Sequence, residues 1–256
     1  MNFLVRCLVA GAVIAAGGIA LPSQAVTTIY YDDFSGSSGT DLAGTAPDIR
    51  PGSETWALGS GDSAIPAQRW KADGSVLGSS SGGGGTTGLL PFTPSAGNIY
   101  ELSVLINPTT TDGSGDWLAL GFLSPSGFPD SPWMFKRGDS GSPAYDTTTF
   151  LGPSTSGGLV TGVPSGSQPS PTDFRIVLDT TPALWTVEWF IDGSSVRTAT
   201  YASNPSITNV GLFRFESAAG SVDNFRLTQV PEPGSLALLG LGLGLLASHR
   251  RAHRFN

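Results

Sequence analysis

The sequence of 256 residues predicts an all-β protein whose body is a single antiparallel β-sandwich, flanked by a signal helix at the N-terminus and a short transmembrane helix at the C-terminus. Three observations predict this fold class. Apolar and polar residues alternate in several segments, which is the period of a half-buried strand. Glycine (35 residues) and proline (19 residues) recur between these segments, as they do at turns. Long helical periodicity is missing from the body, so two packed sheets are the expected architecture.

The first element is a signal peptide over residues 1–25. Arg6 provides a short basic region, Cys7 to Leu21 form an apolar stretch, and Ser23-Gln24-Ala25 is a small-x-small site. This order is typical of a secretory leader that is cut after Ala25. The apolar stretch is short for a membrane-spanning helix, and a polar, threonine-rich segment follows it at once. A retained anchor or a buried helix is the alternative.

The body, residues 26–229, is long enough to bury one core as a single domain. Strands are expected at 98–107, 116–123, 174–178, 185–191, 195–201, 210–215 and 221–229. The first of these strands places four side chains on one face: Tyr100, Leu102, Val104 and Ile106. Asp192-Gly193 is a two-residue hairpin turn, because glycine accepts the positive φ that such turns need. Loops rich in Gly, Ser and Pro are expected at 79–88, 125–132 and 153–171.

The segment from Asp173 to Val196 resembles the late hairpin of concanavalin A-like and laminin-G-like jelly rolls, in which a Trp-x-Val-x-Trp/Phe-x-x-Asp-Gly pattern is common. Tyr31 to Phe34 and Val222 to Phe225 are similar to the edge strands with which such domains open and close. The resemblance implies a jelly roll in which the first and last strands pair.

The last element has three parts in order. Pro231-Glu232-Pro233 comes first, an apolar Gly/Leu run from Gly234 to Ala247 follows, and the chain then has three stop-transfer arginines: Arg250, Arg251 and Arg254. At about 1.5 Å per residue, a helix over the apolar run reaches roughly 21 Å, against a hydrocarbon core of about 30 Å. The arginines would stay in the cytoplasm. A short, glycine-rich span of this kind suits a segment that is held in the membrane briefly and then removed.

This order, over residues 230–256, resembles the PEP-CTERM sorting signal of exopolysaccharide-producing Gram-negative bacteria. One departure is Gly234, where serine or threonine is more usual. The resemblance implies a partner, an exosortase, which is a membrane-embedded cysteine transpeptidase that cuts near Pro-Glu-Pro. It also implies a transient inner-membrane intermediate, followed by placement at the cell surface or in the extracellular matrix. An ordinary tail anchor is the alternative.

The composition of the body limits its chemistry. Its 19 acidic and 9 basic residues give a formal charge of −10, which opposes nucleic acid as a partner and tolerates cations such as Ca²⁺. The only cysteine, Cys7, lies in the signal peptide, and both histidines, His249 and His253, lie in the tail. Catalytic sets that need cysteine or histidine, zinc sites with thiolate or imidazole ligands, and disulfides are therefore excluded from the body.

Carboxylates remain as candidates for catalysis. Hydrolases of the laminarinase type share the jelly-roll fold and carry a Glu-x-Asp-x-x-Glu strand, which places an acid and a nucleophile on one face. The body has four glutamates, and none has an acidic residue two positions away: Glu54, Glu101, Glu188 and Glu216. We therefore expect the protein not to be an enzyme. A glycoside hydrolase that uses carboxylates only is the less favoured alternative.

Acidic residues form two groups that would offer oxygen ligands to a structural Ca²⁺. The terminal group combines Asp32 and Asp33 with Asp223 and Asn224, which would meet if the end strands pair. A second group lies in expected loops: Asp112, Asp116, Asp130 and Asp139. The alternative for both groups is a set of solvated carboxylates at turns and strand ends.

Aromatic side chains are the usual platforms for sugars, because a flat ring stacks on the C–H face of a sugar ring. Trp185 and Trp189 share a strand face and are expected in the core. Trp133 lies in the Pro-flanked segment SPWMFKR, and we predict that it is exposed and binds glycan. The alternative is that Trp133 closes one end of the sandwich.

These patterns predict an exported, non-enzymatic protein with a structural or adhesive role linked to exopolysaccharide or biofilm. Extracellular polysaccharide is the expected partner besides the exosortase. A carbohydrate-binding, lectin-like module of defined specificity is the second hypothesis.

Overall fold

The computed structural model describes residues 25–59, 65–78, 85–109, 116–123, 131–137, 149–152, 160–161, 171–215 and 217–230. All of them belong to one compact unit, Ala25–Glu232. Ala25, the predicted signal cleavage position, is exposed and lies two residues before the first strand. Both predicted terminal helices, the Pro-Glu-Pro motif and the three tail arginines lie outside the described residues. No helix in the described part of the chain has the length and apolarity that crossing a membrane requires.

The described residues form thirteen strands and one short 3-10 helix. The elements are β1 (Thr27–Asp32), η1 (Pro66–Gln68), β2 (Ser75–Val76), β3 (Thr86–Pro91), β4 (Ile99–Pro108), β5 (Trp117–Leu123), β6 (Trp133–Arg137), β7 (Thr149–Gly152), β8 (Val160–Thr161), β9 (Thr172–Asp179), β10 (Thr186–Ile191), β11 (Ser194–Thr200), β12 (Asn209–Phe215) and β13 (Gly220–Val230).

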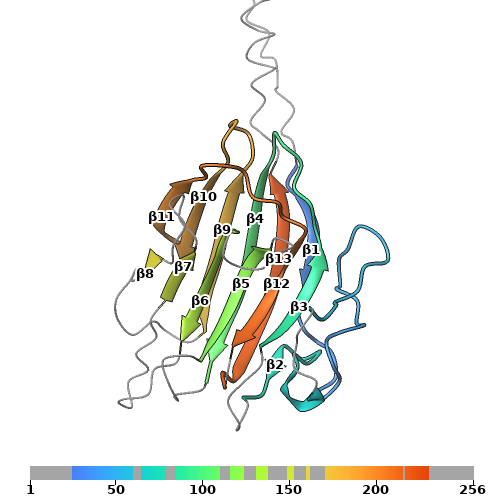
Figure 1. The fold of residues 1–256 in the computed structure, drawn as a ribbon. Coiled ribbons are helices and arrows are strands. Elements are labelled where there is room, and N and C mark those ends of the chain that lie inside the picture. Colours follow the sequence, from blue (N-terminus) through green and yellow to red (C-terminus); the bar gives the residue numbers. More distant parts are fainter. Residues whose placement is uncertain are drawn as a thin grey trace, which may run out of the picture. The chain divides into compact units, whose positions relative to one another are not determined.

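The strands form two sheets that pack face to face (Figure 1). The seven-stranded sheet has the order β1-β13-β4-β9-β10-β11, and β2 pairs with β13 at its side. The six-stranded sheet has the order β3-β12-β5-β6-β7-β8. Every strand pair is antiparallel, including β4 with β9 and β12 with β5. The predicted all-β antiparallel sandwich is confirmed.

The core lies between the two sheets and follows the alternation that the sequence predicts. In β4 the four residues predicted for one face are 0–3% exposed, and in β5 the side chains of Leu118, Leu120 and Phe122 are fully buried. Trp189 is 1% exposed, and Trp185 is a partly buried residue that packs against the core. Apolar side chains on alternate positions of each strand therefore drive the two sheets together.

All seven predicted strands are present, and their ends differ by a few residues at most. The loop predicted at 79–88 is shorter than expected, because its last residues, from Thr86, begin β3. The short strands β2, β7 and β8 were not predicted, and β8 lies inside the loop predicted at 153–171. The longer strand β6 was not predicted either. β3 and β6 both fail to show a long alternating pattern: β3 contains Gly88, and in β6 four consecutive residues from Trp133 are buried. A strand that is covered on both faces cannot be recognised by alternation.

The hairpin between β10 and β11 turns where it was predicted. Asp192 has φ 47° and Gly193 has φ 75°, so both central residues adopt the left-handed conformation of a type I′ turn. A bulge lies next to this turn, since the register of β10 against β11 shifts between Trp189, which is opposite Arg197, and Phe190, which is opposite Ser195.

The predicted pairing of the terminal strands is also confirmed, because β1 pairs with β13 in antiparallel register, with Asp32 opposite Phe225. Of these two terminal strands, β1 lies at an edge of its sheet and β13 does not, since β13 lies between β1 and β4. The register of β13 against β4 shifts between Asp223 and Arg226. Asn224, inside this bulge, has φ 55°, a conformation that asparagine tolerates better than most residues.

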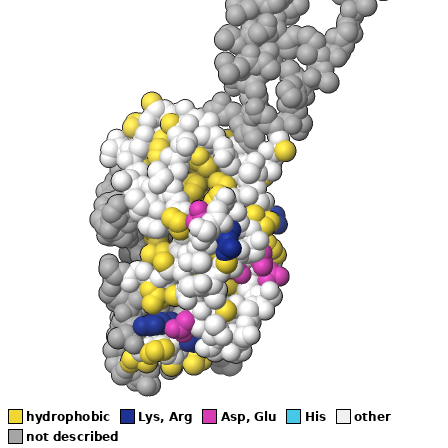
Figure 2. All heavy atoms as spheres, turned by 90° about the vertical axis from the view of Figure 1, so that its right-hand side faces the viewer, with side chains coloured by type: hydrophobic (Ala, Val, Ile, Leu, Met, Phe, Trp, Pro, Cys, Tyr) yellow, Lys and Arg dark blue, Asp and Glu magenta, His cyan; other side chains and the backbone are white. Residues whose placement is uncertain are grey.

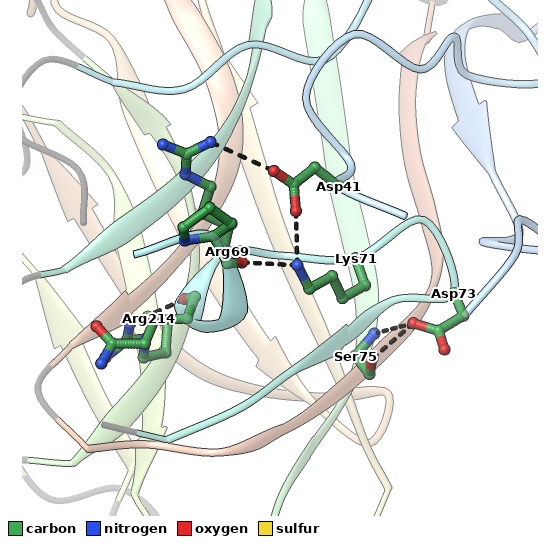
Figure 3. A network of polar contacts seen from close by, with 8 residues as sticks. Asp41, Arg69, Lys71, Asp73, Ser75 and Arg214 are labelled. Carbon is green, nitrogen blue, oxygen red and sulfur yellow. Dashed lines mark hydrogen bonds and ion pairs between the residues drawn. The ribbon is translucent and has the colours of Figure 1, made fainter. Parts of the chain in front are cut away.

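The long connection between β1 and β3 is held by a polar network (Figure 3). The carboxylate of Asp41 accepts hydrogen bonds from Lys71 Nζ at 2.5 Å and from Arg69 Nη1 at 3.3 Å. Lys71 Nζ also donates to the carbonyl of Pro66 at 2.6 Å. Arg214 of β12 donates to the carbonyl of Gln68 at 2.9 Å. These contacts fix the segment around η1 against the six-stranded sheet.

Candidate functional site

The outward side of the six-stranded sheet carries five aromatic rings, which we call the aromatic face: Trp117, Trp133, Phe135, Phe213 and Phe215. They come from three neighbouring strands. β5 contributes Trp117, opposite Phe215 of β12 on one side and Arg137 of β6 on the other. Because side chains alternate along a strand, these rings point away from the core residues Leu118 and Met134.

The rings of the aromatic face stack on one another. Trp117 lies at the centre, with ring centroids 4.7 Å from Phe135, 5.0 Å from Phe215 and 5.1 Å from Phe213. Trp133 stacks on Phe135 at 5.1 Å with an interplanar angle of 16°. Such offset stacks hold each ring in a defined plane. The result is an apolar row of rigid side chains whose ring faces lie against one another.

Exposure differs across the aromatic face. Trp117, Phe213 and Phe215 are half-buried, whereas Trp133 is 6% and Phe135 is 3% exposed. The expectation that Trp133 is exposed is therefore corrected. Trp133 belongs to a strand, and Gly121 opposite it has no side chain: a Cβ at that position would lie 2.7 Å from the Cβ of Trp133. The glycan-binding role of Trp133 stays a prediction, while sequence reasoning missed Trp117, Phe213 and Phe215 as members of the same surface.

The six strands under the aromatic face contain no aspartate or glutamate. Their charged residues are all cations: Lys136, Arg137 and Arg214. Lys136 and Arg214 point inward and are fully buried. Lys136 Nζ donates to the hydroxyl of Thr172 at 2.6 Å, and burial lowers the pKa of this lysine to about 8. Arg137 lies with its guanidinium 6.0 Å from the ring of Phe135. All charged side chains on the strands of this sheet are therefore positive.

The predicted terminal calcium group comes together only in part. Asp32 and Asp33 have carboxylate oxygens within 4.8 Å of each other and of a third residue, Asp48, which sequence reasoning did not single out. Asp48 is brought there by the backbone bridge between Tyr31 and Ile49. Since that bridge joins positions 18 residues apart in the numbering, with no shared motif, only the tertiary structure reveals Asp48.

Asp32 already has partners within the protein. Its carboxylate accepts hydrogen bonds from the indole nitrogen of Trp56 at 2.6 Å and from the amide of Phe34 at 2.8 Å. Burial raises the pKa of Asp32, and these two hydrogen bonds oppose the rise. Asp33 is exposed, and its amide donates to Asp48 Oδ2 at 3.0 Å. Ca²⁺ prefers six to eight oxygen ligands, so three carboxylates would be part of a site only.

The other two predicted ligands have different surroundings. Asn224 Oδ1 accepts a hydrogen bond from the hydroxyl of Tyr31 at 3.0 Å, and Asp223 accepts one from the amide of Asn224 at 2.7 Å. Asp223 does not belong to the group formed by Asp32, Asp33 and Asp48. Of the loop group, Asp116 is 4% exposed and accepts a hydrogen bond from the amide of Ser217. The remaining loop aspartates, Asp112, Asp130 and Asp139, lie outside the described residues.

Comparison with solved structures agrees with this architecture. An endo-1,3-beta-glucanase from Streptomyces sioyaensis is similar over 82% of this chain and 99% of its own length, at 16% sequence identity and a TM-score of 0.53. The carbohydrate recognition domain of Emp47p covers 76% of this chain and 96% of its own length, at 14% identity and a TM-score of 0.42. The likeness to the glucanase shows that the body has a jelly-roll β-sandwich fold. No curated protein is detectably similar in sequence.

The tail is recognised independently of the body. The family model described as the PEP-CTERM protein-sorting motif matches residues 229–251. The chain therefore combines a jelly-roll body with a PEP-CTERM sorting motif at its C-terminal end, as the resemblance of Pro231-Glu232-Pro233 and its following segments implied.

Proposed function

We propose that this chain is an exported, non-enzymatic protein of the cell surface or extracellular matrix, and that it contacts polysaccharide through the aromatic face. One observation carries the proposal: a row of stacked aromatic rings, three of them half-buried, lies on a sheet whose strands contain no carboxylate. Aromatic side chains bind sugars by apolar contact with their C–H groups, and such contact cleaves no bond.

The positions of the three glutamates that the structure describes support a non-enzymatic role; Glu216 lies outside the described residues. Glycoside hydrolysis needs two carboxyl groups that flank the scissile bond. Glu101 and Glu188 lie on strands of the opposite sheet, where Glu101 pairs with Arg175 at 3.1 Å and Glu188 accepts a hydrogen bond from Ser195. Glu54 lies in the connection between β1 and β3 and accepts a hydrogen bond from the amide of Gly52. Hydrolysis of a sugar polymer that is abolished by a single Glu→Gln change would instead establish a hydrolase that uses carboxylates only.

The tail supports the location. A PEP-CTERM motif implies processing by an exosortase after a membrane-anchored intermediate. Release at this motif would place the acidic body outside the inner membrane, where polysaccharide is the abundant polymer. The structural or adhesive role in an exopolysaccharide matrix or biofilm follows from this combination of location and surface.

An array of bacterial and plant glycans, probed with the full chain, tests the proposal. Phe215→Ala and Trp117→Ala remove half-buried rings from the aromatic face, and we expect each to weaken glycan binding by about tenfold or more. Phe190→Ala is the matched control, because Phe190 is a half-buried ring on the outer side of the other sheet. Trp133→Ala tests the residue predicted from the sequence. Binding to no glycan, or equal losses with Phe190→Ala, would contradict the proposal.

A lectin-like module of defined specificity is the second candidate function. Pre-ordered ring planes favour it, because rigid side chains lose little conformational entropy when a ligand binds. Saturable binding to one glycan on the array, with weak binding to its isomers, separates this function from a general adhesive role.

A further inference from the structure

The outer side of the seven-stranded sheet contains a hollow of about 320 Å³ at the bulge of β13. Tyr31, Ser103, Leu105, Asp173, Asn224 and Arg226 line it. The residues come from four neighbouring strands, β1, β13, β4 and β9, so the hollow sits on the sheet and does not depend on any loop. It opens where the register between β13 and β4 shifts, because the bulge leaves Asn224 without a partner residue on β4.

Several polar groups in this hollow make no hydrogen bond within the described part of the chain. Among the described residues, the guanidinium of Arg226 makes no hydrogen bond or ion pair, and its contact is the ring of Tyr31 at 5.2 Å. The hydroxyl of Ser103 and the carboxylate of Asp173 likewise have no hydrogen bond within the described part of the chain. The side-chain oxygen of Asn224 accepts a hydrogen bond from the hydroxyl of Tyr31, so the side-chain nitrogen of Asn224 can donate to a ligand.

The contrast with the neighbouring arginine is informative. Arg175 faces outward on β9, and Ser103 is paired with Arg226 on one side and with Arg175 on the other. Arg175 forms an ion pair with Glu101 at 3.1 Å and lies 3.8 Å from the ring of Phe190. It does not line the hollow. Arg175 therefore has both an ion pair and a ring contact within the protein. Arg226 has the ring contact but no ion pair among the described residues.

The chemistry of the lining matches a sugar ring. Arg226 and Asn224 are donors, Asp173 is an acceptor, and Ser103 is both. Vicinal hydroxyl groups need donors and acceptors side by side, and the rings and apolar side chains of Tyr31 and Leu105 suit the C–H groups between them. The one positive and one negative side chain balance each other, and the acidic body as a whole repels polyanions.

We propose that this hollow binds one neutral glycosyl unit, so that the chain has a second sugar site on the sheet opposite the aromatic face. The choice of a polysaccharide as the source of that unit rests on the proposed function, but the site does not need the aromatic face. Two sites on opposite outer faces would let one chain bridge two polysaccharide strands, which gives avidity without tighter individual contacts.

The test is calorimetric titration of the full chain, kept in a detergent without a sugar headgroup, with neutral hexose oligosaccharides and, separately, with uronic acid oligosaccharides. We expect at least one neutral oligosaccharide to bind, and Arg226→Gln and Tyr31→Ala each to weaken that binding by about tenfold. Arg175→Gln is the matched control and should change the affinity less than about twofold. Thermal melting of each variant checks that the fold is kept.

The outcomes separate the two sites. If Phe215→Ala abolishes all binding and Arg226→Gln abolishes none, the second site is refuted and the aromatic face stands. If Arg226→Gln removes binding that Phe215→Ala leaves unchanged, the second site stands whether or not the aromatic face binds. Binding of uronic acid oligosaccharides alone, or no neutral oligosaccharide that depends on Arg226, overturns the inference.

Discussion

At the scale of single residues, Asp32 is the buried carboxylate that joins β1 to the connection following it. Asp32→Ala would leave the indole N–H of Trp56 and the amide of Phe34 without their acceptor in a buried position. We expect the free energy of unfolding to fall by about 2–4 kcal/mol, measured by urea denaturation. Asp33→Ala is the control, since Asp33 is exposed, and it should lower the free energy of unfolding clearly less than Asp32→Ala. An equal decrease in the free energy of unfolding for both variants would show that the buried hydrogen bonds of Asp32 do not account for its effect.

Lys136 gives the molecule a predictable pH dependence. Its pKa is lowered to about 8 in the folded state, from an ordinary value of 10.5. Between pH 8 and 10 the unfolded chain keeps this proton while the folded chain has lost it, so stability rises with pH. Above pH 10 the trend reverses, because burial raises the pKa of Tyr30 to about 12 and the unfolded chain loses that phenolic proton first.

We expect the free energy of unfolding to rise by about 2–3 kcal/mol between pH 8 and 10, measured by urea denaturation at each pH. Lys136→Met removes the titrating group while keeping most of its volume, and it should flatten this rise. An identical rise in the variant would assign the effect to other groups.

The group of Asp32, Asp33 and Asp48 tests the calcium prediction. A bound cation would relieve the repulsion among three carboxylates and raise the melting temperature of the full chain in millimolar Ca²⁺. Asp48→Asn and Asp33→Asn should reduce that rise, and Asp223→Asn should not. A melting temperature that is the same in Ca²⁺ and in EDTA would remove the prediction.

At the scale of elements, ion pairs stabilise the connection between β1 and β3, which has little secondary structure of its own. Lys71 is 8% exposed and relies on Asp41 for its counter-charge (Figure 3). Asp41→Ala would leave a buried ammonium with only the carbonyl of Pro66, and we expect a loss of about 1–3 kcal/mol in urea denaturation. Asp73→Ala is the control, because Asp73 accepts hydrogen bonds from serines, among them Ser75 of its own turn, and not from a buried cation. A loss no larger than the control's would contradict the role of Asp41.

The same network predicts acid sensitivity. Lys71, followed by Arg69, holds the pKa of Asp41 below its ordinary value. The ion pairs therefore add stability above the ordinary pKa of an aspartate, and this contribution is lost as the pH falls through the lowered value.

Elements differ in how well they can be read from the sequence. β4 and β9 alternate strictly because one face meets the core and the other meets solvent. Most of β5 and β6 is covered on both faces, so apolar and polar residues do not alternate along them: β5 is an apolar run, and β6 buries Lys136 together with three apolar residues. The aromatic face and β6 were not predicted from the sequence for the same reason. When both faces of a strand are covered, polar residues no longer alternate with apolar ones.

At the scale of the whole molecule, the two sheets differ in charge. Acidic residues lie on strands of the seven-stranded sheet, among them Glu101, Asp173 and Glu188, while the strands of the six-stranded sheet carry cations only. Charged side chains are sparse on the side of the molecule that Figure 2 shows, where most of the surface is uncharged.

Sorting belongs to this scale as well. We expect native protein to lack both the first 25 residues and the arginines of the tail, as measured by intact-mass spectrometry. Replacing Pro231, Glu232 and Pro233 by alanine should leave the tail attached and the protein in the inner membrane. Arg137→Ala, a single change in the body, is the control and should be processed normally. An intact arginine-bearing tail in native protein would contradict the sorting proposal.

The sequence by itself determined the all-β class, the hairpin at Asp192-Gly193, the pairing of the end strands and the sorting motif, because each depends on a local pattern or on a resemblance carried by contiguous residues. Tertiary structure alone decided which side chains meet. It brought Asp48 to Asp32, buried Trp133 within a stacked surface, and placed Arg226 in a hollow without an acidic partner. The physical reason is that strand pairing joins residues far apart in the chain, and a one-residue bulge such as that at Asn224 changes which face a side chain occupies.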